Sequence, residues 1–318
     1  MKLTVAIAQA APVVLNRAAT IDKACQWITE AGRRGARLVA FPETWVPCYP
    51  LWCDAGSFGK WDHGPSKKLH ARLVRESVQV PSGDTEKLCQ AARAAKTGVV
   101  IGINERDPHS GSLYNTLMFI SPEGKLAGRH RKLVPTFGER LVWGYGDAAG
   151  LTTYDFDGAK VGGLVCWEHW MPLARQVLHA SDEQVHVAAW PHLRETYLIA
   201  SRHYAFEGRA FVLAAASVLR KSDLPADFEL ADDFKDAPEQ LLIGGSCIIG
   251  PDAKYVVEPV YEKEELLTAE LDLERLSEEK LALDVAGHYN RPDIFDLRVR
   301  REPLLPFRLA DDKPSDSN

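Results

Sequence analysis

The sequence lacks several patterns that would assign a protein to a class at once. Its six cysteines form no CxxC pair and have no zinc-type spacing with histidine, and none of its ten histidines lies in an HExxH motif. No apolar run approaches the length of a membrane span, and the apolar stretch at the N-terminus is too short for a secretory signal. We therefore expect a reduced, cytoplasmic protein that has no metal site and does not enter a membrane.

The charge balance argues against one class of partner. The chain has 38 Lys and Arg against 44 Asp and Glu, which gives a net charge of −6 at pH 7. The two signs are interspersed, so the basic surface that nucleic-acid binding requires is not expected. Hydrophobic residues make up 46% of the 318 residues, enough for a large core. We predict one domain over residues 1–310, followed by a disordered tail at 311–318 that has no apolar anchor.

The hydrophobic pattern predicts a mixed α/β fold. Leu3, Val5 and Ile7 alternate as in a strand, and a helix is expected from an Asn16 N-cap to a stop at Gly35. Two further helices are expected at about 85–96 and 195–208. Further strands are expected at 38–41, 99–103, 113–120, 126–130, 153–156, 160–165, 185–189, 211–216 and 246–249. This order favours mixed sheets with helices on their outer faces.

One cysteine is placed where a nucleophile would be. Cys166 ends the apolar strand 161–165 and precedes a segment in which a helix is expected to begin. A strand-to-helix turn exposes a side chain at a sheet edge, and nearby helix amides lower a thiol pKa. Gly162 and Gly163 would let other parts of the backbone approach closely. By itself, however, a buried structural cysteine is the more common case.

Three charged residues also follow predicted strands. Glu43 comes directly after an apolar strand and among aromatic residues, where desolvation raises a carboxyl pKa towards values useful to a general base. Lys132 follows the second strand of a predicted hairpin, and Glu139 lies a few residues further on. Taken singly, the lysine could simply face water, Glu43 could lie in a surface loop, and Glu139 could pair with Arg140.

Four segments in this order and spacing resemble the nitrilase superfamily, in its true-nitrilase branch. They are Phe-Pro-Glu-Thr-Trp at 41–45, His-Arg-Lys-Leu-Val-Pro-Thr at 130–136, Phe-Gly-Glu-Arg at 137–140 and Cys-Trp-Glu-His-Trp-Met-Pro at 166–172. The resemblance implies an α-β-β-α sandwich that needs no metal or organic cofactor. It also implies that Cys166 is the nucleophile, Glu43 the general base, Lys132 the third catalytic residue and Glu139 a glutamate that positions the site.

By this resemblance the substrate is a small nitrile, converted to the carboxylic acid and ammonia through a covalent thioimidate and thioester. An aliphatic amidase and a cyanide-degrading enzyme of the same superfamily remain alternatives, as does a non-catalytic assembly protein. The resemblance further implies a homodimer or a larger spiral homo-oligomer. Its expected contacts are the helix after Cys166, the helix 195–208 and the C-terminal segment from about Gly287.

The substrate pocket is less well defined by the sequence. Aromatic side chains near the motifs could wall it or could equally be core residues; they are Trp45, Tyr49, Trp52, Trp167, Trp170 and Trp190. Of these, Tyr49, Trp167 and Trp190 are predicted to contact substrate, together with His169. His169 stands where nitrilases often carry asparagine, which leaves its role open.

Overall fold

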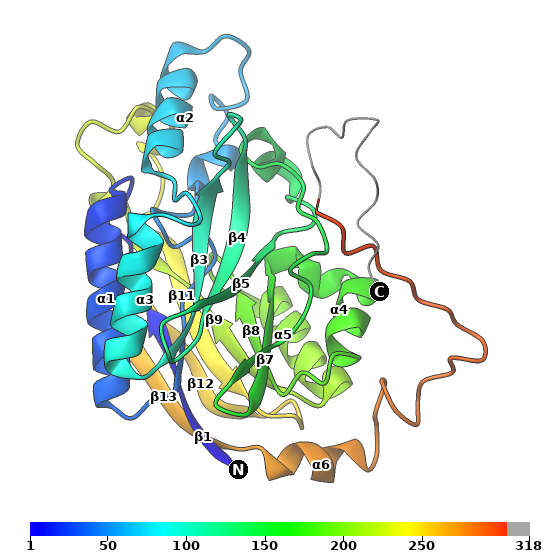
Figure 1. Cartoon of the computed structure of the whole chain (residues 1–318). Coiled ribbons are helices and arrows are strands. Elements are labelled where there is room, and N and C mark those ends of the chain that lie inside the picture. Colours follow the sequence, from blue (N-terminus) through cyan, green and yellow to red (C-terminus); the bar gives the residue numbers. More distant parts are fainter. Residues whose placement is uncertain (304–318) are drawn as a thin grey trace.

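Two β-sheets packed face to face form the centre of the molecule (Figure 1). The computed structural model describes residues 1–303, so the tail predicted at 311–318 lies outside the described residues. The strand order is β13-β1-β2-β3-β4-β5 in one sheet and β10-β11-β9-β8-β7-β6 in the other, where β12 also pairs with β11. Both sheets combine parallel and antiparallel pairs, as the sequence predicted.

The strands and helices have the following bounds. The first sheet contains β1 (Lys2–Gln9), β2 (Leu38–Ala40), β3 (Gly98–Arg106), β4 (Leu113–Ile120), β5 (Leu126–Arg131) and β13 (Glu265–Asp272). The second contains β6 (Tyr154–Phe156), β7 (Ala159–Val165), β8 (Val185–Ala189), β9 (Phe211–Ala215), β10 (Val218–Arg220), β11 (Gln240–Ile249) and β12 (Tyr255–Tyr261). The helices are α1 (Arg17–Arg33), α2 (Gly64–Glu76), α3 (Gly83–Ala95), α4 (Pro172–His179), α5 (Glu195–Gly208) and α6 (Glu274–Lys280).

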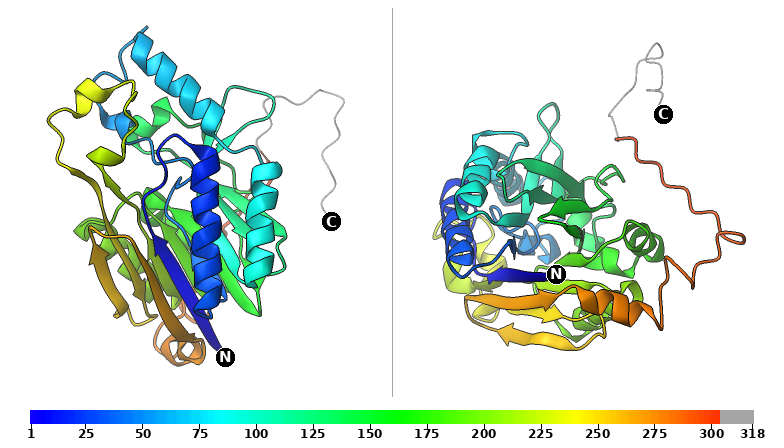
Figure 2. Two further views of the ribbon diagram at one scale, coloured as in Figure 1. Left: turned by 90° about the vertical axis from the view of Figure 1, so that its left-hand side faces the viewer. Right: turned by 60° about the horizontal axis from the view of Figure 1, so that its bottom comes forward.

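Helices cover the outer face of each sheet. Helices α1 and α3 lie side by side against the first sheet, whereas α4 and α5 pack on the second (Figure 2). Strand β1 shows how both faces are buried: Val5 and Ile7 point into the core between the sheets, and Ala6 and Ala8 into the core beneath α1 and α3. Successive strand side chains point to opposite faces, so such a strand is apolar at almost every position. The predicted α-β-β-α sandwich is confirmed.

Local signals placed most elements correctly. Asn16 caps α1 by accepting a hydrogen bond from the Ala19 N–H, and Gly35 follows the helix at φ +82°. Strand β11 is longer than the predicted 246–249. Gly244 and Gly245 interrupt its apolar pattern, so the sequence revealed only the part of the strand that follows them. Strands β12 and β13 were not predicted; β12 is only half-buried and carries no continuous apolar run.

The chain topology brings the motif residues to one edge of the sandwich. Glu43 follows β2, Lys132 follows β5 and Cys166 follows β7, each within three residues of the strand end. After the last strand, residues 281–303 leave the sandwich in an extended path (Figure 1). No helix within residues 1–303 is both long and apolar enough to span a membrane.

Candidate active site

Cys166 lies in a sharp turn at the end of β7. It starts a short 3-10 helix, Cys166–Trp170, and α4 begins only at Pro172, so the helix expected after Cys166 is preceded by this tighter turn. Its φ of +53° is in the left-handed region that non-glycine residues seldom adopt. Burial, reinforced by the Glu43 carboxylate, raises the pKa of the Cys166 thiol well above its usual value, whereas Lys132 opposes this. The thiol therefore needs a base to ionise it.

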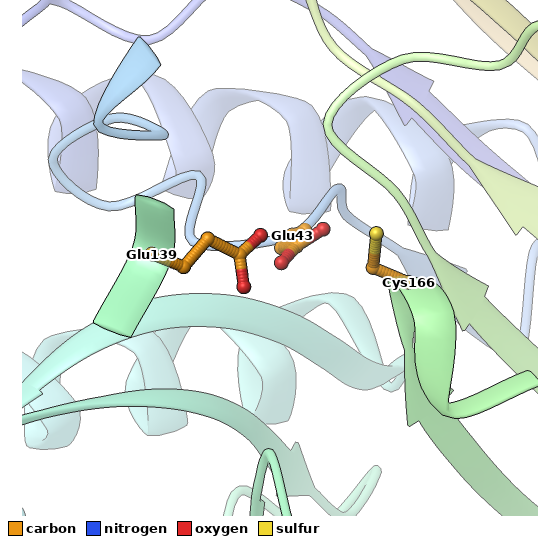
Figure 3. A group of neighbouring side chains, drawn as sticks. All are labelled: Glu43, Glu139 and Cys166. Carbon is orange, nitrogen blue, oxygen red and sulfur yellow. The ribbon is translucent and has the colours of Figure 1, made fainter. Parts of the chain in front are cut away.

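Lys132 joins two buried carboxylates beside this thiol. Its Nζ donates to Glu43 Oε1 at 3.0 Å and to Glu139 Oε2 at 2.6 Å. The Cys166 sulfur and one oxygen of each carboxylate all lie within 4.8 Å of one another. Figure 3 shows Glu43 between Glu139 and Cys166. The four residues predicted to be catalytic are thus brought together, although they come from separate segments.

The electrostatics of this group give its members different protonation states. Burial raises the pKa of Glu43 to about 7, with Lys132 opposing and the Glu139 charge adding to the rise. Burial also lowers the pKa of Lys132, but Glu43, Cys166 and Glu139 together outweigh it, so the net direction is upward. Lys132 consequently stays an ammonium, while Glu43 can exchange a proton near neutral pH.

Neighbouring residues fix the two carboxylates. Asn115 Nδ2 donates to Glu43 Oε1 at 2.6 Å, and the Tyr49 hydroxyl donates to Glu139 Oε1 at 2.9 Å. Within residues 1–303, the other oxygen of Glu43 has no hydrogen-bond partner and is free to take a proton. The sequence analysis missed Asn115; the signal was a single amide inside the apolar strand Leu113–Ile120.

A buried glutamate links the segment of Lys132, after β5, to the turn of Cys166, after β7. Glu168 accepts hydrogen bonds from the N–H of Leu133 at 2.8 Å and of Val165 at 2.7 Å. His130 Nε2 lies 3.0 Å from both of its oxygens. Burial would raise the pKa of Glu168, but His130 and the backbone donors outweigh it, so the pKa falls. Both residues belong to the motif segments, yet this role was not predicted.

A cavity of about 730 Å³ opens onto the sulfur. Its wall is largely apolar and aromatic and includes a few charged side chains; the lining residues are Tyr49, Leu51, Asp54, Thr136, Phe137, Glu139, Cys166, Trp167, Pro191, His192, Arg194, Tyr197, Phe234, Pro238, Leu241 and Leu242. Two residues predicted to bind substrate, Tyr49 and Trp167, are in this wall. Ligand sites are commonly cavities of this size with a few polar groups at their base.

The other two predicted substrate contacts lie elsewhere. His169 and Trp190 are 1% and 0% exposed and do not line the cavity. Their rings stack on each other at 4.8 Å, behind the nucleophile. The prediction did not anticipate this because the 3-10 turn after Cys166 directs His169 inward. Trp45 and Trp52 are core residues, and Trp170 is on the surface.

The same donor atoms would suit a metal by distance alone. Glu43, Glu139 and Cys166 are the cluster within the described chain that could coordinate an ion. However, the Lys132 ammonium already bonds to both carboxylates. A lysine cation therefore supplies the positive charge that an ion would bring to this position.

Comparison with known proteins agrees with this geometry. The family model described as carbon-nitrogen hydrolase matches residues 4–280. The chain is 42% identical to "Nitrilase 2" of an unknown prokaryotic organism over 98% of this chain and 97% of that protein. It is 39% identical to the "Aliphatic nitrilase" of Rhodococcus rhodochrous over 99% of this chain and 84% of the relative.

A carbon-nitrogen hydrolase from Helicobacter pylori G27 shares the fold, with a TM-score of 0.72 and 19% identity over 92% of this chain and 97% of that one. The chain belongs to the carbon-nitrogen hydrolase family.

Proposed function

We propose that this protein is a nitrilase that converts an organic nitrile and two waters into a carboxylic acid and ammonia. The observation that carries the proposal is the buried group of Cys166, Glu43, Lys132 and Glu139, two of which, Cys166 and Glu139, line the cavity. Relatives named as nitrilases, at up to 42% identity over 98% of the chain, support the choice of a nitrile over other carbon–nitrogen substrates.

The proposed reaction begins with attack by sulfur. Glu43 takes the thiol proton of Cys166, and the thiolate adds to the nitrile carbon. One carbon–nitrogen π bond breaks as the carbon–sulfur bond forms, and the nitrogen gains negative charge. The Lys132 ammonium lies beside the sulfur and stabilises or protonates this nitrogen, which leaves a thioimidate. Glu139 holds Lys132 in place through their 2.6 Å hydrogen bond.

Hydrolysis then releases the two products. The thiol proton held by Glu43 reaches the nitrogen through Lys132, to which Glu43 is hydrogen-bonded, so that Lys132 is again an ammonium and Glu43 a carboxylate. Glu43 then deprotonates a water, whose hydroxide adds to the thioimidate carbon; the second carbon–nitrogen π bond breaks and the water proton passes to the nitrogen. Transfer of the hydroxyl proton to the nitrogen breaks the remaining carbon–nitrogen bond, which releases ammonia and forms the thioester carbonyl. A second water attacks the resulting thioester, and breaking the carbon–sulfur bond frees the acid and the Cys166 thiol. A Glu43 pKa of about 7 suits a group that must accept and return protons in turn.

The cavity favours a substrate with an apolar body. Trp167, Tyr197 and Phe234 offer aromatic walls, and Leu241 and Leu242 add aliphatic surface. An arylacetonitrile or an aliphatic nitrile would both suit such walls. Tyr49 and Trp167 are the residues that we propose contact the substrate. His169 and Trp190 are not, because they lie outside the cavity.

The assay that tests the proposal is ammonia release from phenylacetonitrile, an aliphatic dinitrile, cyanide and a simple amide, with Cys166→Ala as the control. We expect ammonia from an organic nitrile, and at least about a thousandfold loss in the control, since the nucleophile is removed. Ammonia from the amide or from cyanide alone would contradict the nitrilase proposal and indicate a sister activity. Equal rates in the Cys166→Ala variant would exclude Cys166 as nucleophile.

We extend the proposal to the assembly and the compartment. Apolar side chains on α4 and α5 face solvent, including Leu173 at 67%, Ile199 at 52% and Phe206 at 46% exposure. Together with the exposed Phe295 in the extended C-terminal segment, they favour a homo-oligomer. All six cysteines are free within the described part of the chain, which suits a reducing cytoplasm.

A further inference from the structure

A chain of buried hydrogen bonds runs from the main chain of Cys166 away from the cavity. The Cys166 carbonyl oxygen lies 2.6 Å from His169 Nδ1, and His169 Nε2 lies 3.0 Å from His186 Nε2. His186 Nδ1 is 2.8 Å from Glu183 Oε1, and the Tyr204 hydroxyl donates to Glu183 Oε2. None of the four side chains is more than 3% exposed. The reaction described above leaves all four without a role.

The hydrogen bonds determine which nitrogen of each imidazole carries a proton. A carbonyl oxygen can only accept, so His169 Nδ1 must donate to Cys166. Burial, together with His186, lowers the pKa of His169 to about 3, so this ring is neutral. Its Nε2 is therefore an acceptor, and His186 Nε2 must donate to it. The tautomer of His169 is thus dictated from both sides.

Glu183 completes the chain at its far end. Burial raises the pKa of Glu183 to about 8, although the hydrogen bond from Tyr204 opposes the rise. Glu183 and His186 share one proton, and His186 Nε2 keeps its hydrogen whichever partner holds that proton. A Cβ on Gly162 would lie 2.1 Å from Glu183 Oε1. The sequence analysis expected Gly162 to allow close approach of other backbone. The structure shows that the missing side chain at Gly162 instead makes room for the Glu183 side chain.

The hydrogen bond from His169 to the Cys166 carbonyl fixes the orientation of the peptide group between Cys166 and Trp167. In a trans peptide the C=O and the N–H point in opposite directions. The Cys166 carbonyl points towards His169, so the N–H of Trp167 is turned the other way, and its effect on the Cys166 thiol is to lower the thiol pKa against the larger rise from burial. The φ of +53° at Cys166 is unfavourable, so an outside contact has to hold this turn.

We propose that His169 is a positioning residue, held in one tautomer by His186, Glu183 and Tyr204. Its bond to the Cys166 carbonyl keeps the Trp167 N–H aimed at the reacting atoms. There the N–H stabilises the thiolate and, granted the nitrilase function proposed above, the negative charge that develops on the nitrile nitrogen.

A second contact links the same ring to the general base. His169 stacks on Trp190 with ring centroids 4.8 Å apart and an interplanar angle of 23°. The Trp190 carbonyl accepts the backbone N–H of Glu43 at 3.3 Å. The position of His169 therefore supports both the nucleophile and the residue that deprotonates it.

Two matched variants separate positioning from simple packing. Asparagine places its amide nitrogen where His169 has Nδ1, so His169→Asn keeps the donor to Cys166 and loses the bond to His186. His169→Gln keeps a polar group near Nε2 and loses the donor to Cys166. The measurements are kcat and KM on whichever nitrile the parent protein hydrolyses, the rate of alkylation of Cys166 by iodoacetamide read by peptide mass spectrometry, and Tm.

We expect His169→Asn to stay within about threefold of the parent in kcat and in alkylation rate, although its Tm falls. For His169→Gln we expect kcat to fall about 10- to 100-fold and alkylation to slow, with KM within about threefold. Equal losses in both variants, or activities that simply follow Tm, would overturn the proposal. If the parent hydrolyses no nitrile, the nitrilase function fails, and the alkylation rates still decide the role of His169.

Discussion

The Glu168 carboxylate accepts a hydrogen bond from the backbone N–H of Leu133 at 2.8 Å, and this contact joins the segment after β5 to the turn after β7. Leu133 follows Lys132 directly, and Glu168 is two residues after Cys166. The same carboxylate also binds the Val165 N–H at the end of β7. The distance between the lysine ammonium and the sulfur therefore depends on a side chain that lies outside the cavity.

Replacing Glu168 with Gln tests this link. Glutamine has only one side-chain oxygen that can accept a hydrogen bond. In the variant its NH₂ group would therefore face one of the two backbone N–H groups that donate to the Glu168 carboxylate in the parent protein. We expect the free energy of unfolding to fall by about 1–3 kcal/mol, as for a buried donor left unpaired, and kcat to fall with it. Urea denaturation and ammonia release measure the two effects. Glu270→Gln, at an exposed residue paired with Lys2, is the control and should change neither.

Lys132→Met should destabilise the protein in a way that depends on pH. The variant leaves two buried carboxylates, Glu43 and Glu139, without their cation, which costs about 3–5 kcal/mol when both are ionised. Burial already raises the pKa of Glu43 to about 7 against the opposing effect of Lys132, so loss of the ammonium raises it further above the unfolded value. The folded variant therefore binds more protons than the unfolded chain, and its stability falls as pH rises.

The measurement is Tm at pH 6 and at pH 8, relative to the parent at each pH. We expect the larger deficit at pH 8, together with loss of turnover at both values. Lys254→Met serves as the control because Lys254 is 82% exposed and pairs with the carboxylate of Asp252 at the surface. A deficit that is the same at both pH values would contradict the proposed charge balance.

Glu43 should govern the acid side of the pH–rate profile. A general base acts only when deprotonated, so kcat/KM should rise with pH through about 7, where burial places the pKa of Glu43. Glu43→Gln should lower kcat by about 10²- to 10⁴-fold and remove this rise from the residual activity. Ammonia release between pH 5 and 9 tests both points. Persistence of the same rise in the variant would assign it to another group.

Trp167→Ala should alter substrate preference rather than chemistry. The indole is 48% exposed and lines the cavity, while the backbone N–H that faces the sulfur is retained. Loss of this wall should raise KM for phenylacetonitrile about tenfold, equivalent to roughly 1.4 kcal/mol of lost apolar contact, and should affect a short aliphatic nitrile less. Trp170→Ala is the matched control, because Trp170 is 43% exposed and not in the cavity lining. Equal changes in the two variants would contradict the role of Trp167.

The sequence alone predicted many of the elements and the motif residues, although not helices α2 and α6 or strands β10, β12 and β13. Helix α5 begins and ends where its pattern predicted, and Asn16 caps α1 as expected. These features depend on neighbours within a few positions, so hydrophobic periodicity and capping chemistry reveal them. The four catalytic candidates were recognised differently, from the resemblance of four short motifs, in their order and spacing, to the nitrilase superfamily; taken singly, each had an ordinary structural explanation.

Only the tertiary structure decided how these residues are used. Lys132, which by itself could have been a solvent-facing lysine, is 1% exposed between two carboxylates. Asn115, from an adjacent strand, joined the site, and Glu183, from beyond α4, joined the hydrogen-bond chain behind it, without either having been predicted, whereas His169 turned away from the cavity. The physical reason is that burial and hydrogen bonding depend on strand order and sheet packing, which join residues 43, 115, 132, 166 and 183. Periodicity within a segment carries no information about such distant neighbours.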